Sequence, residues 1–402
     1  MRIVHLSDLH LGYRQYQRQT PTGINQREAD VAASFKRAID EIIELSPDFV
    51  LIAGDVFHTV RPTNPAILHA FTQFARLAQA LPNAGIVVVA GNHDVPRTAE
   101  TGCILRLFAP LGIHVVDMEA RRVEFPDRGV SILAVPDVGG ARPALRPDPN
   151  AKYNILLLHG EVEGVLPDYV RQAERAAIEI TPEELGADQW DYVALGHYHV
   201  YREVGPNAYY SGSIDYTSSN AWGELREERA ARLGDTGRGG KGFIEHNLIT
   251  HEHRFHSLSV SRPLIDLPPI DATGMSIEDL DAAIATCVAQ CHGGIDDKIV
   301  RLVVRDVPRH ITRELNHKAI REYKRRALHF HLDARKPDLV RRSASGGLVR
   351  RPSLADTVRD KLTTRVLTDD IDRTTFVDLG LKYLRDADEL AASTPVLGKV
   401  AE

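Results

Sequence analysis

The sequence is poor in cysteine, with only Cys103, Cys287 and Cys291 in 402 residues. The number is odd and no pair has the spacing of a zinc site, which argues against a disulfide framework and against a zinc knuckle. We expect buried or idle thiols. No stretch reaches the roughly 20 apolar residues that cross a bilayer, and the amino terminus lacks the basic region and apolar run of a signal peptide. We therefore expect a cytoplasmic protein that does not enter a membrane.

A Gly-rich phosphate loop that ends in Gly-Lys-Ser/Thr is also missing, so any dependence on ATP would have to come from a partner. The net charge of -6 does not favour nucleic acid, but the charge is unevenly distributed. Residues 301–351 carry fifteen Lys and Arg and only five Asp and Glu, so this region suits anions. A length of 402 residues exceeds what one core usually serves, and we expect two or three units.

Five short apolar runs in the first 200 residues predict buried strands. They are Ile3 to Leu6, Phe49 to Ala53, Ile86 to Ala90, Ile155 to Leu158 and Tyr192 to Leu195. Amphipathic segments lie between them, and a helical period is clear over residues 26–45 and 64–81. Strands that alternate with helices indicate a layered α/β domain.

A short polar motif follows each of these five runs. The motifs are Asp8-Leu9-His10, Gly54-Asp55, Gly91-Asn92-His93-Asp94, His159-Gly160 and Gly196-His197-Tyr198-His199. The carboxyl ends of the strands in an open α/β sheet form one edge, so residues far apart in sequence can meet there. Carboxylates and imidazoles without thiolates favour manganese, iron or zinc over copper(I) or calcium. Asp55 could bridge two such ions, as two-metal hydrolysis requires.

The motif series resembles that of the calcineurin-like metallophosphoesterases. Two details narrow the resemblance to the SbcD family of DNA-repair nucleases: Asp8-Leu9-His10-Leu11-Gly12 and Gly54-Asp55-Val56-Phe57-His58. Tyr210-Ser211-Gly212-Ser213 and Lys241-Gly242-Phe243 are also similar to that family. The resemblance covers about residues 1 to 250 and is looser beyond them. It implies a layered α/β/β/α sandwich with a small α+β capping domain and carboxyl-terminal helices.

The resemblance also implies roles for the site residues and two divalent metal ions, Mn2+ in the first place. The implied ligands of one ion are Asp8, His10, Asp55 and His199, and those of the other are Asp55, Asn92, His159 and His197. His93 would face the phosphate and protonate the leaving oxygen or stabilise its charge. Asp94 would either support the site from outside the ligands or be an ordinary turn carboxylate. His58 would either steer the DNA or orient a ligand.

Four regions are expected along the chain: a nuclease domain at 1–260, a capping and DNA-binding domain at 261–340, a linker at 341–352 and a helical segment at 353–402. The polar stretch from Glu224 to Lys241 is predicted to be a mobile loop. In the capping domain a helix begins after Ser276, its N-cap, and a basic helix capped by Thr312 runs to about Ala327.

Six basic residues cluster on that last helix: Arg313, Lys318, Arg321, Lys324, Arg325 and Arg326. They could neutralise several phosphates of DNA, or they could form a solvated helix face. Two amphipathic helices follow, at about 354–366 and 374–390. They resemble the segment with which SbcD binds its SMC-like coiled-coil ATPase partner, SbcC, although packing onto the protein's own core is an equal alternative.

The function that these observations favour is a manganese-dependent DNA exonuclease and endonuclease subunit of a double-strand-break repair complex, a homodimer that works with an ATPase. One alternative is a small-molecule phosphodiesterase or phosphatase of the same fold, which would not need the basic region. Another is a scaffold that docks DNA or the ATPase, which would not need the metal ligands. A third is a paralogue with a different SMC-like ATPase and another substrate.

Overall fold

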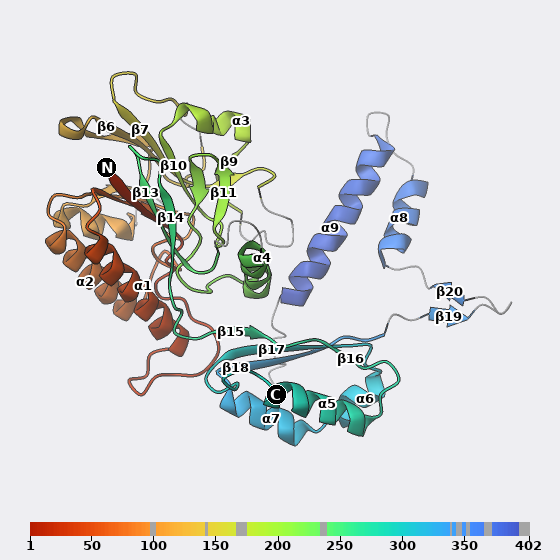
Figure 1. Ribbon diagram of the computed structural model, residues 1–402. Helices are drawn as coiled ribbons and strands as arrows, with labels where there is room; N and C mark the ends of the chain where they lie inside the picture. Colours follow the sequence, from red (N-terminus) through yellow and green to blue (C-terminus); the bar gives the residue numbers. More distant parts are fainter. Residues whose placement is uncertain are drawn as a thin grey trace. The chain divides into compact units, whose positions relative to one another are not determined.

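The chain divides into two units, Met1–Leu264 and Ile265–Glu402. Figure 1 shows the computed structural model, coloured along the sequence. The structure describes residues 1–96, 102–140, 144–165, 175–233, 239–337, 340–342, 348–350, 354–365 and 372–393. We describe each unit by itself.

The first unit is built on two six-stranded sheets. One has the order β14-β13-β1-β2-β3-β4. Its strands are β1 (Arg2–Leu6), β2 (Phe49–Ala53), β3 (Gly85–Val89), β4 (His114–Val116), β13 (Gly242–Asn247) and β14 (His253–Ser257). The pairs β1–β2, β2–β3 and β3–β4 are parallel, and the pairing of Ile3 with Phe49 sets the first register. The carboxyl ends of β1, β2 and β3 therefore lie along one edge.

The other sheet has the order β11-β12-β10-β7-β6-β5. Its strands are β5 (Arg121–Phe125), β6 (Val130–Val135), β7 (Tyr153–His159), β10 (Tyr192–Gly196), β11 (Arg202–Gly205) and β12 (Ala208–Tyr210). Strands β7 and β10 are parallel, with His159 paired to Gly196. A short parallel pair, β8 (Glu161–Val162) and β9 (Glu179–Ile180), continues beyond β7.

Three apolar layers hold the sandwich together. Between the sheets, side chains such as Phe49, Leu157 and Tyr192 interdigitate. The outer face of the first sheet packs on α1 (Gln26–Leu45) and α2 (Asn64–Ala80), which lie together in Figure 1, and on the 3-10 helix η2 (Ile104–Leu111). On the outer face of the second sheet, Leu185 of α3 (Pro182–Leu185) packs into the apolar layer, and the 3-10 helix η4 (Ala187–Gln189) follows α3. A further 3-10 turn, η3 (Pro126–Arg128), joins β5 to β6. The predicted α/β/β/α sandwich and its five strands are confirmed.

The prediction of a mobile loop from Glu224 to Lys241 is wrong for most of its length. Residues Ala221–Leu233 form the helix α4, and residues 234–238 lie outside the described part of the chain. The helix is rich in Ala, Leu, Glu and Arg, all good helix formers. Glu224 and Glu228 of α4 are buried, as is Lys241, and Lys241 Nζ pairs with both carboxylates. This internal ion pairing anchors a segment whose polar composition suggested a loop.

The second unit contains a small sheet made of β15 (Leu264–Asp266), β16 (Ile270–Asp271), β17 (Ile299–Arg305) and β18 (His329–Ala334). The helices α5 (Ile277–Ala289), α6 (Arg309–Glu314) and α7 (His317–Arg326) pack on one face of it (Figure 1). Ser276 caps α5 as predicted, in a capping box with Asp279.

The predicted single basic helix capped by Thr312 is a wrong interpretation. Thr312 lies inside α6, and its hydroxyl donates to Pro308 O at 3.3 Å. The helix is interrupted at Leu315 and Asn316. A new helix, α7, begins with Asn316 as its N-cap, and the Asn316 side chain accepts a hydrogen bond from Ala319 N. Asn316 satisfies one of the amide groups that a new helix exposes, and the burial of Ile311 and Leu315 fixes the turn.

The carboxyl-terminal part forms two helices, α8 (Leu354–Thr364) and α9 (Arg373–Ser393). They pack on each other closely, since a Cβ added at Gly380 would meet Leu362 Cδ1 at 2.2 Å. The predicted linker at 341–352 falls partly on the short hairpin β19 (Val340–Arg342) and β20 (Leu348–Arg350), and its remaining residues lie outside the described ones. Among the residues that the structure describes, no helix is both long and apolar enough to span a membrane.

Candidate metal centre

The residues of the five motifs gather at the carboxyl ends of β1, β2, β3, β7 and β10. The backbone is unusual there: Asp8, His10, Asp55 and His197 all have positive φ, at 53°, 45°, 53° and 111°. Such conformations cost about 1 to 3 kcal/mol each in non-glycine residues and persist where the surroundings impose them, commonly at functional sites. The chain turns sharply after β1, β2 and β10, and ligand atoms that follow these strands gather in the same space.

One group of donors comes from the segments that follow β1 and β10. Ligand atoms of Asp8, His10 and His199 lie within 4.8 Å of one another, and all three residues are buried. The two Nε2 atoms of His10 and His199 are 2.9 Å apart. Ser7 Oγ donates to Asp8 Oδ2 at 2.5 Å, and the amide of His197 donates to Asp8 Oδ1 at 3.1 Å, which fixes the carboxylate.

A second group centres on Asp55. Its Oδ2 lies 3.5 Å from His159 Nε2 and 3.7 Å from His10 Nε2, so this oxygen stands between the two groups. Asn92 Oδ1 lies 3.1 Å from His159 Nε2 and 3.3 Å from His197 Nδ1. The structure therefore brings together all seven residues predicted as ligands.

His58 and His93 form the rim of the site. Their rings stack with centroids 5.3 Å apart, and the ring of His93 meets that of His10 edge-on at 4.8 Å. His93 Nδ1 lies 2.8 Å from the carbonyl oxygen of His58. A carbonyl can only accept, so Nδ1 of His93 carries a hydrogen. His58 Nδ1 in turn lies 3.3 Å from Nδ1 of His10.

Asp94 is buried, and its carboxylate faces main-chain amides. Its carboxylate accepts from the amides of Val56, Phe57 and Gly91 at 3.0 to 3.1 Å. These bonds tie the turn after β3 to the turn after β2. Burial and the neighbouring Asp55 raise the pKa of Asp94, against the three amide bonds, which lower it. This geometry suits a residue that holds the two turns in place.

Three histidines of the site, His10, His58 and His159, are held neutral. Burial is the main reason why the pKa of His159 and the pKa of His58 are each lowered to about 4. Burial, and after it the neighbouring imidazoles, also lowers the pKa of His10. His197 is the exception, because the hydrogen bond and charge of Glu161 outweigh burial and raise its pKa. Neutral imidazoles have lone pairs available for a metal ion.

The donor set fits divalent cations. Two Nε2 atoms that face each other at 2.9 Å can share at most one hydrogen, so at least one of them presents a lone pair, the group that a cation binds. Two carboxylates, one amide oxygen and four imidazoles match manganese, iron or zinc. Asp8, His10, Asp55 and His199 would hold one ion, and Asp55, Asn92, His159 and His197 would hold the other.

Sequence reasoning missed a layer of residues behind these donors. Glu161 Oε1 lies 3.2 Å from His197 Nε2, and Glu224 Oε1 lies 3.4 Å from His199 Nδ1. Lys241 Nζ donates to His199 O at 2.9 Å and to Ser213 Oγ at 3.0 Å. The similarity around residues 210–213 and 241–243 was the available signal, but its structural role required the fold.

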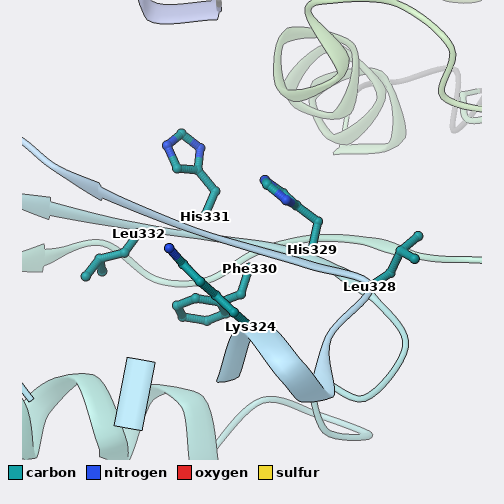
Figure 2. A pocket seen from close by; sticks show the side chains of 6 residues that line it. All are labelled: Lys324, Leu328, His329, Phe330, His331 and Leu332. Atoms are coloured by element: carbon teal, nitrogen blue, oxygen red, sulfur yellow. The ribbon is translucent and has the colours of Figure 1, made fainter. Parts of the chain in front are cut away.

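A separate hollow of about 260 Å3 lies in the second unit, at β18 (Figure 2). It is lined by Lys324, Leu328, His329, Phe330, His331 and Leu332. Figure 2 shows His329 and His331 on one side of the strand and Phe330 on the other. None of the residues predicted as metal ligands lines it.

A two-sheet α/β sandwich with carboxylates and imidazoles gathered at its strand ends defines a class of metal-dependent hydrolases. Residues 1–213, more than half of the chain, match the model of the calcineurin-like phosphoesterase family. The chain belongs to this family. Metal-dependent cleavage of phosphoesters is thus the chemistry for which its site is built, and divalent metals are its cofactors.

Several curated relatives share the name DNA double-strand break repair protein Mre11. The protein of Methanococcus maripaludis is 30% identical over 263 residues, which cover 60% of this chain and 62% of the relative. That of Methanocaldococcus jannaschii is 28% identical over 265 residues, 60% of this chain and 61% of the relative. That of Sulfurisphaera tokodaii is 33% identical over 208 residues, or 50% and 49%. The matched region spans about three fifths of the first two relatives.

Proposed function

We propose that this protein is a manganese-dependent DNA phosphodiesterase, an exonuclease and endonuclease that serves double-strand-break repair. The observation that carries the proposal is the convergence of seven oxygen and nitrogen donors, with Asp55 between the two groups. The name that the relatives share, DNA double-strand break repair protein Mre11, supports DNA as the substrate. We assign this activity to residues 1–260, DNA contact also to 261–340, and partner binding to 353–402 beyond the linker 341–352.

When bound, two divalent cations supply a nucleophile from water at neutral pH and neutralise charge on the phosphate. The chain's own residues orient the reaction. Because Nδ1 of His93 donates to His58 O, any proton that His93 gives to the leaving oxygen must come from Nε2 of the protonated ring. His58 positions this ring by its carbonyl and lies at the rim, where it can also steer the substrate. Asp94 holds the turn that carries Asn92 and His93.

The basic face of α7 supports DNA as the substrate. Lys318, Arg321 and Lys324 are exposed and recur at a spacing that places them on one side of the helix. Arg325 and Arg326 form ion pairs with Glu322 and Asp296, so part of their charge is already balanced. Lys318, Arg321 and Lys324 are therefore better placed to contact phosphates than Arg325 and Arg326.

Two exposed apolar surfaces support the proposed partners. Leu68 and Phe71 of α2 and Leu107 of η2 are exposed at 67%, 40% and 38%, and we propose this surface for the homodimer. The helices α8 and α9 expose Leu354, Leu379 and Tyr383, and we propose that they bind an SMC-like coiled-coil ATPase of the SbcC type. Phe71→Asp should convert a dimer to a monomer in light scattering, and an unchanged mass would exclude this surface.

Cleavage of end-labelled single- and double-stranded DNA with Mn2+ or Mg2+ tests the proposal. The wild-type protein should release nucleotides with Mn2+, and Asp55→Asn should not. The matched control is Asp127→Asn, which removes an exposed carboxylate of the same unit and should keep full activity. If Asp55→Asn still cleaves DNA, the site assignment is wrong.

The same assay separates the two rival functions. Hydrolysis of bis(p-nitrophenyl) phosphate without any cleavage of DNA would identify a small-molecule phosphodiesterase. Binding of DNA without hydrolysis of either compound would identify a scaffold. The seven gathered donors favour the nuclease over the scaffold, and the basic face of α7 favours it over the small-molecule enzyme.

A further inference from the structure

Each of the four histidines predicted as ligands has a ring nitrogen that faces away from the other ligands, and four different partners meet these nitrogens. His159 Nδ1 lies 2.8 Å from Ala53 O, and His10 Nδ1 lies 3.3 Å from His58. The two histidines of the motif Gly196-His197-Tyr198-His199 instead face carboxylates. Glu161 lies 3.2 Å from Nε2 of His197, and Glu224 lies 3.4 Å from Nδ1 of His199.

We propose that Glu161 and Glu224 are positioning residues of the metal centre, which fix His197 and His199 so that Nδ1 of the first and Nε2 of the second bind the ions. The inference rests on the proposed two-metal function. It adds α4, which supplies Glu224, and β8, which supplies Glu161, to the machinery of the site.

The second ring nitrogen of each of these two histidines, Nδ1 of His197 and Nε2 of His199, faces the other predicted ligands. His197 Nδ1 lies 3.3 Å from Asn92 Oδ1, and His199 Nε2 lies 2.9 Å from His10 Nε2. A carboxylate that accepts a ring N–H fixes the tautomer and the ring orientation and makes the opposite nitrogen a stronger ligand. Glu161 acts on its ligand atom through a hydrogen bond to the ring of His197, and Glu224 acts through the close approach of its carboxylate to the ring of His199.

The surroundings hold both carboxylates in place. Glu161 is 4% exposed, and its oxygens also lie 3.2 Å from the amide of Ala176 and 3.3 Å from the hydroxyl of Tyr198. Glu224 is 2% exposed and accepts from Lys241 Nζ and from the hydroxyl of Ser218. A buried carboxylate is costly unless it is paired, so these bonds make the charge beside each histidine tolerable.

Lys241 links Glu224 to His199 a second time. Its Nζ donates to the main-chain oxygen of His199 at 2.9 Å and to the carboxylate of Glu224. The ring and the backbone of His199 are thus held by one ion pair. Glu228 joins the same pair from one turn further along α4, with Oε1 3.3 Å from Lys241 Nζ and Oε2 2.6 Å from the hydroxyl of Tyr216. The carboxylate of Glu228 contacts Lys241 and Tyr216 rather than the ring of His199.

Glu224 approaches His199 whereas Glu228 does not, so Glu228 is a matched control for Glu224 on the same helix. Calorimetric titration of metal-free protein with MnCl2 should show a ten- to hundredfold weaker affinity for Glu224→Gln, the usual effect of losing an outer partner of a metal-bound histidine. Glu228→Gln removes the same charge from the same lysine and should stay within about twofold of the wild type. If both variants weaken Mn2+ binding equally, or neither does, Glu224 has no specific role.

The second glutamate has its own pair of variants. Glu161→Gln should weaken Mn2+ binding by a similar factor, while Glu163→Gln, an exposed neighbour on the far side of Val162, should leave it unchanged. Melting temperatures without metal should be alike for each pair. A lower melting temperature with unchanged Mn2+ affinity would show that Glu161 is purely structural and would overturn its assignment.

A crystal structure of the wild-type protein grown with Mn2+ tests the assignment without any substitution. Anomalous peaks should lie next to Nδ1 of His197 and Nε2 of His199. A peak next to Nδ1 of His199 would overturn the inference and leave the proposed function intact. Failure of the wild type to take up Mn2+ at all would overturn both.

Discussion

The two units of the molecule differ in how deeply their functional charged side chains are buried. In the first unit Asp8, Asp55 and His159 are 0%, 2% and 0% exposed and lie among other polar groups, a costly arrangement that turned backbones and fixed partners maintain. In the second unit the basic side chains of α7 stay in water, as for Arg325, whose side chain is 74% exposed. Buried and prearranged charge suits chemistry, whereas exposed charge suits reversible contact with a polyanion. The comparison predicts that variants of the two units will fail in different ways.

Asp55→Asn should have the largest effect. It removes charge from the position between the two donor groups, and kcat for DNA cleavage should fall by at least about a hundredfold, as when a prearranged charge is lost from an active site. The dissociation constant for DNA, measured by fluorescence anisotropy in Ca2+, should change little. A variant that keeps kcat and loses DNA binding would reverse the roles of the units.

The triple variant Lys318→Ala, Arg321→Ala, Lys324→Ala should show the opposite pattern. DNA affinity should weaken, and the slope of log Kd against log salt should shrink by about 0.9 per lost phosphate contact for duplex DNA. At saturating DNA, kcat should remain near that of the wild type. Arg326→Ala, at a residue paired to Asp296, is the control and should change the slope less. Equal slopes for the triple variant and the wild type would show that α7 is only a solvated face.

Buried histidines of the first unit should make the protein sensitive to acid. Burial lowers the pKa of His5 to about 3, below its ordinary 6.5. The unfolded chain therefore binds a proton first, and stability falls as the pH drops from about 6.5 towards 3. His5→Gln should flatten this slope by up to about 1.4 kcal/mol per pH unit. Urea unfolding in EDTA at several pH values measures it.

The control for this titration is His251→Gln, at an exposed position of the same unit. It should keep the wild-type slope. If His5→Gln and His251→Gln give the same slope, the buried imidazole is not the cause of the acid sensitivity.

The smallest effect on the isolated protein should come from α9. Tyr383→Ser alters a side chain that is 64% exposed, so the free energy of unfolding should change by less than about 0.5 kcal/mol. Capture of the coiled-coil ATPase on an affinity column should nevertheless be lost. Undiminished capture would assign the partner to another surface.

Much of the first unit could be predicted from the sequence because each local signal agreed with the fold. Apolar runs of four or five residues gave the strands, and parallel order carried their polar ends to one edge. The gathering of Asp8, Asp55 and His159 follows from that rule alone, since the sheet brings distant motifs together without any further information.

The layer behind the ligands could not be predicted in the same way. Glu224 meets His199 only because α4 folds back, and the polar composition of its segment suggested a loop. Glu228 and Lys241 form an ion pair inside the protein, and the polar composition of the segment does not reveal that these charges are buried. The break between α6 and α7 was missed for a similar reason, because Asn316 as a cap competes with Thr312 and tertiary packing decides between them.

The count of Mn2+ bound per chain tests the central claim most directly. Equilibrium dialysis of metal-free protein, followed by metal analysis, should give two Mn2+ per wild-type chain and fewer for Asp55→Asn, with Asp127→Asn unchanged. One ion or none in the wild type, or equal numbers in all three proteins, would contradict the account.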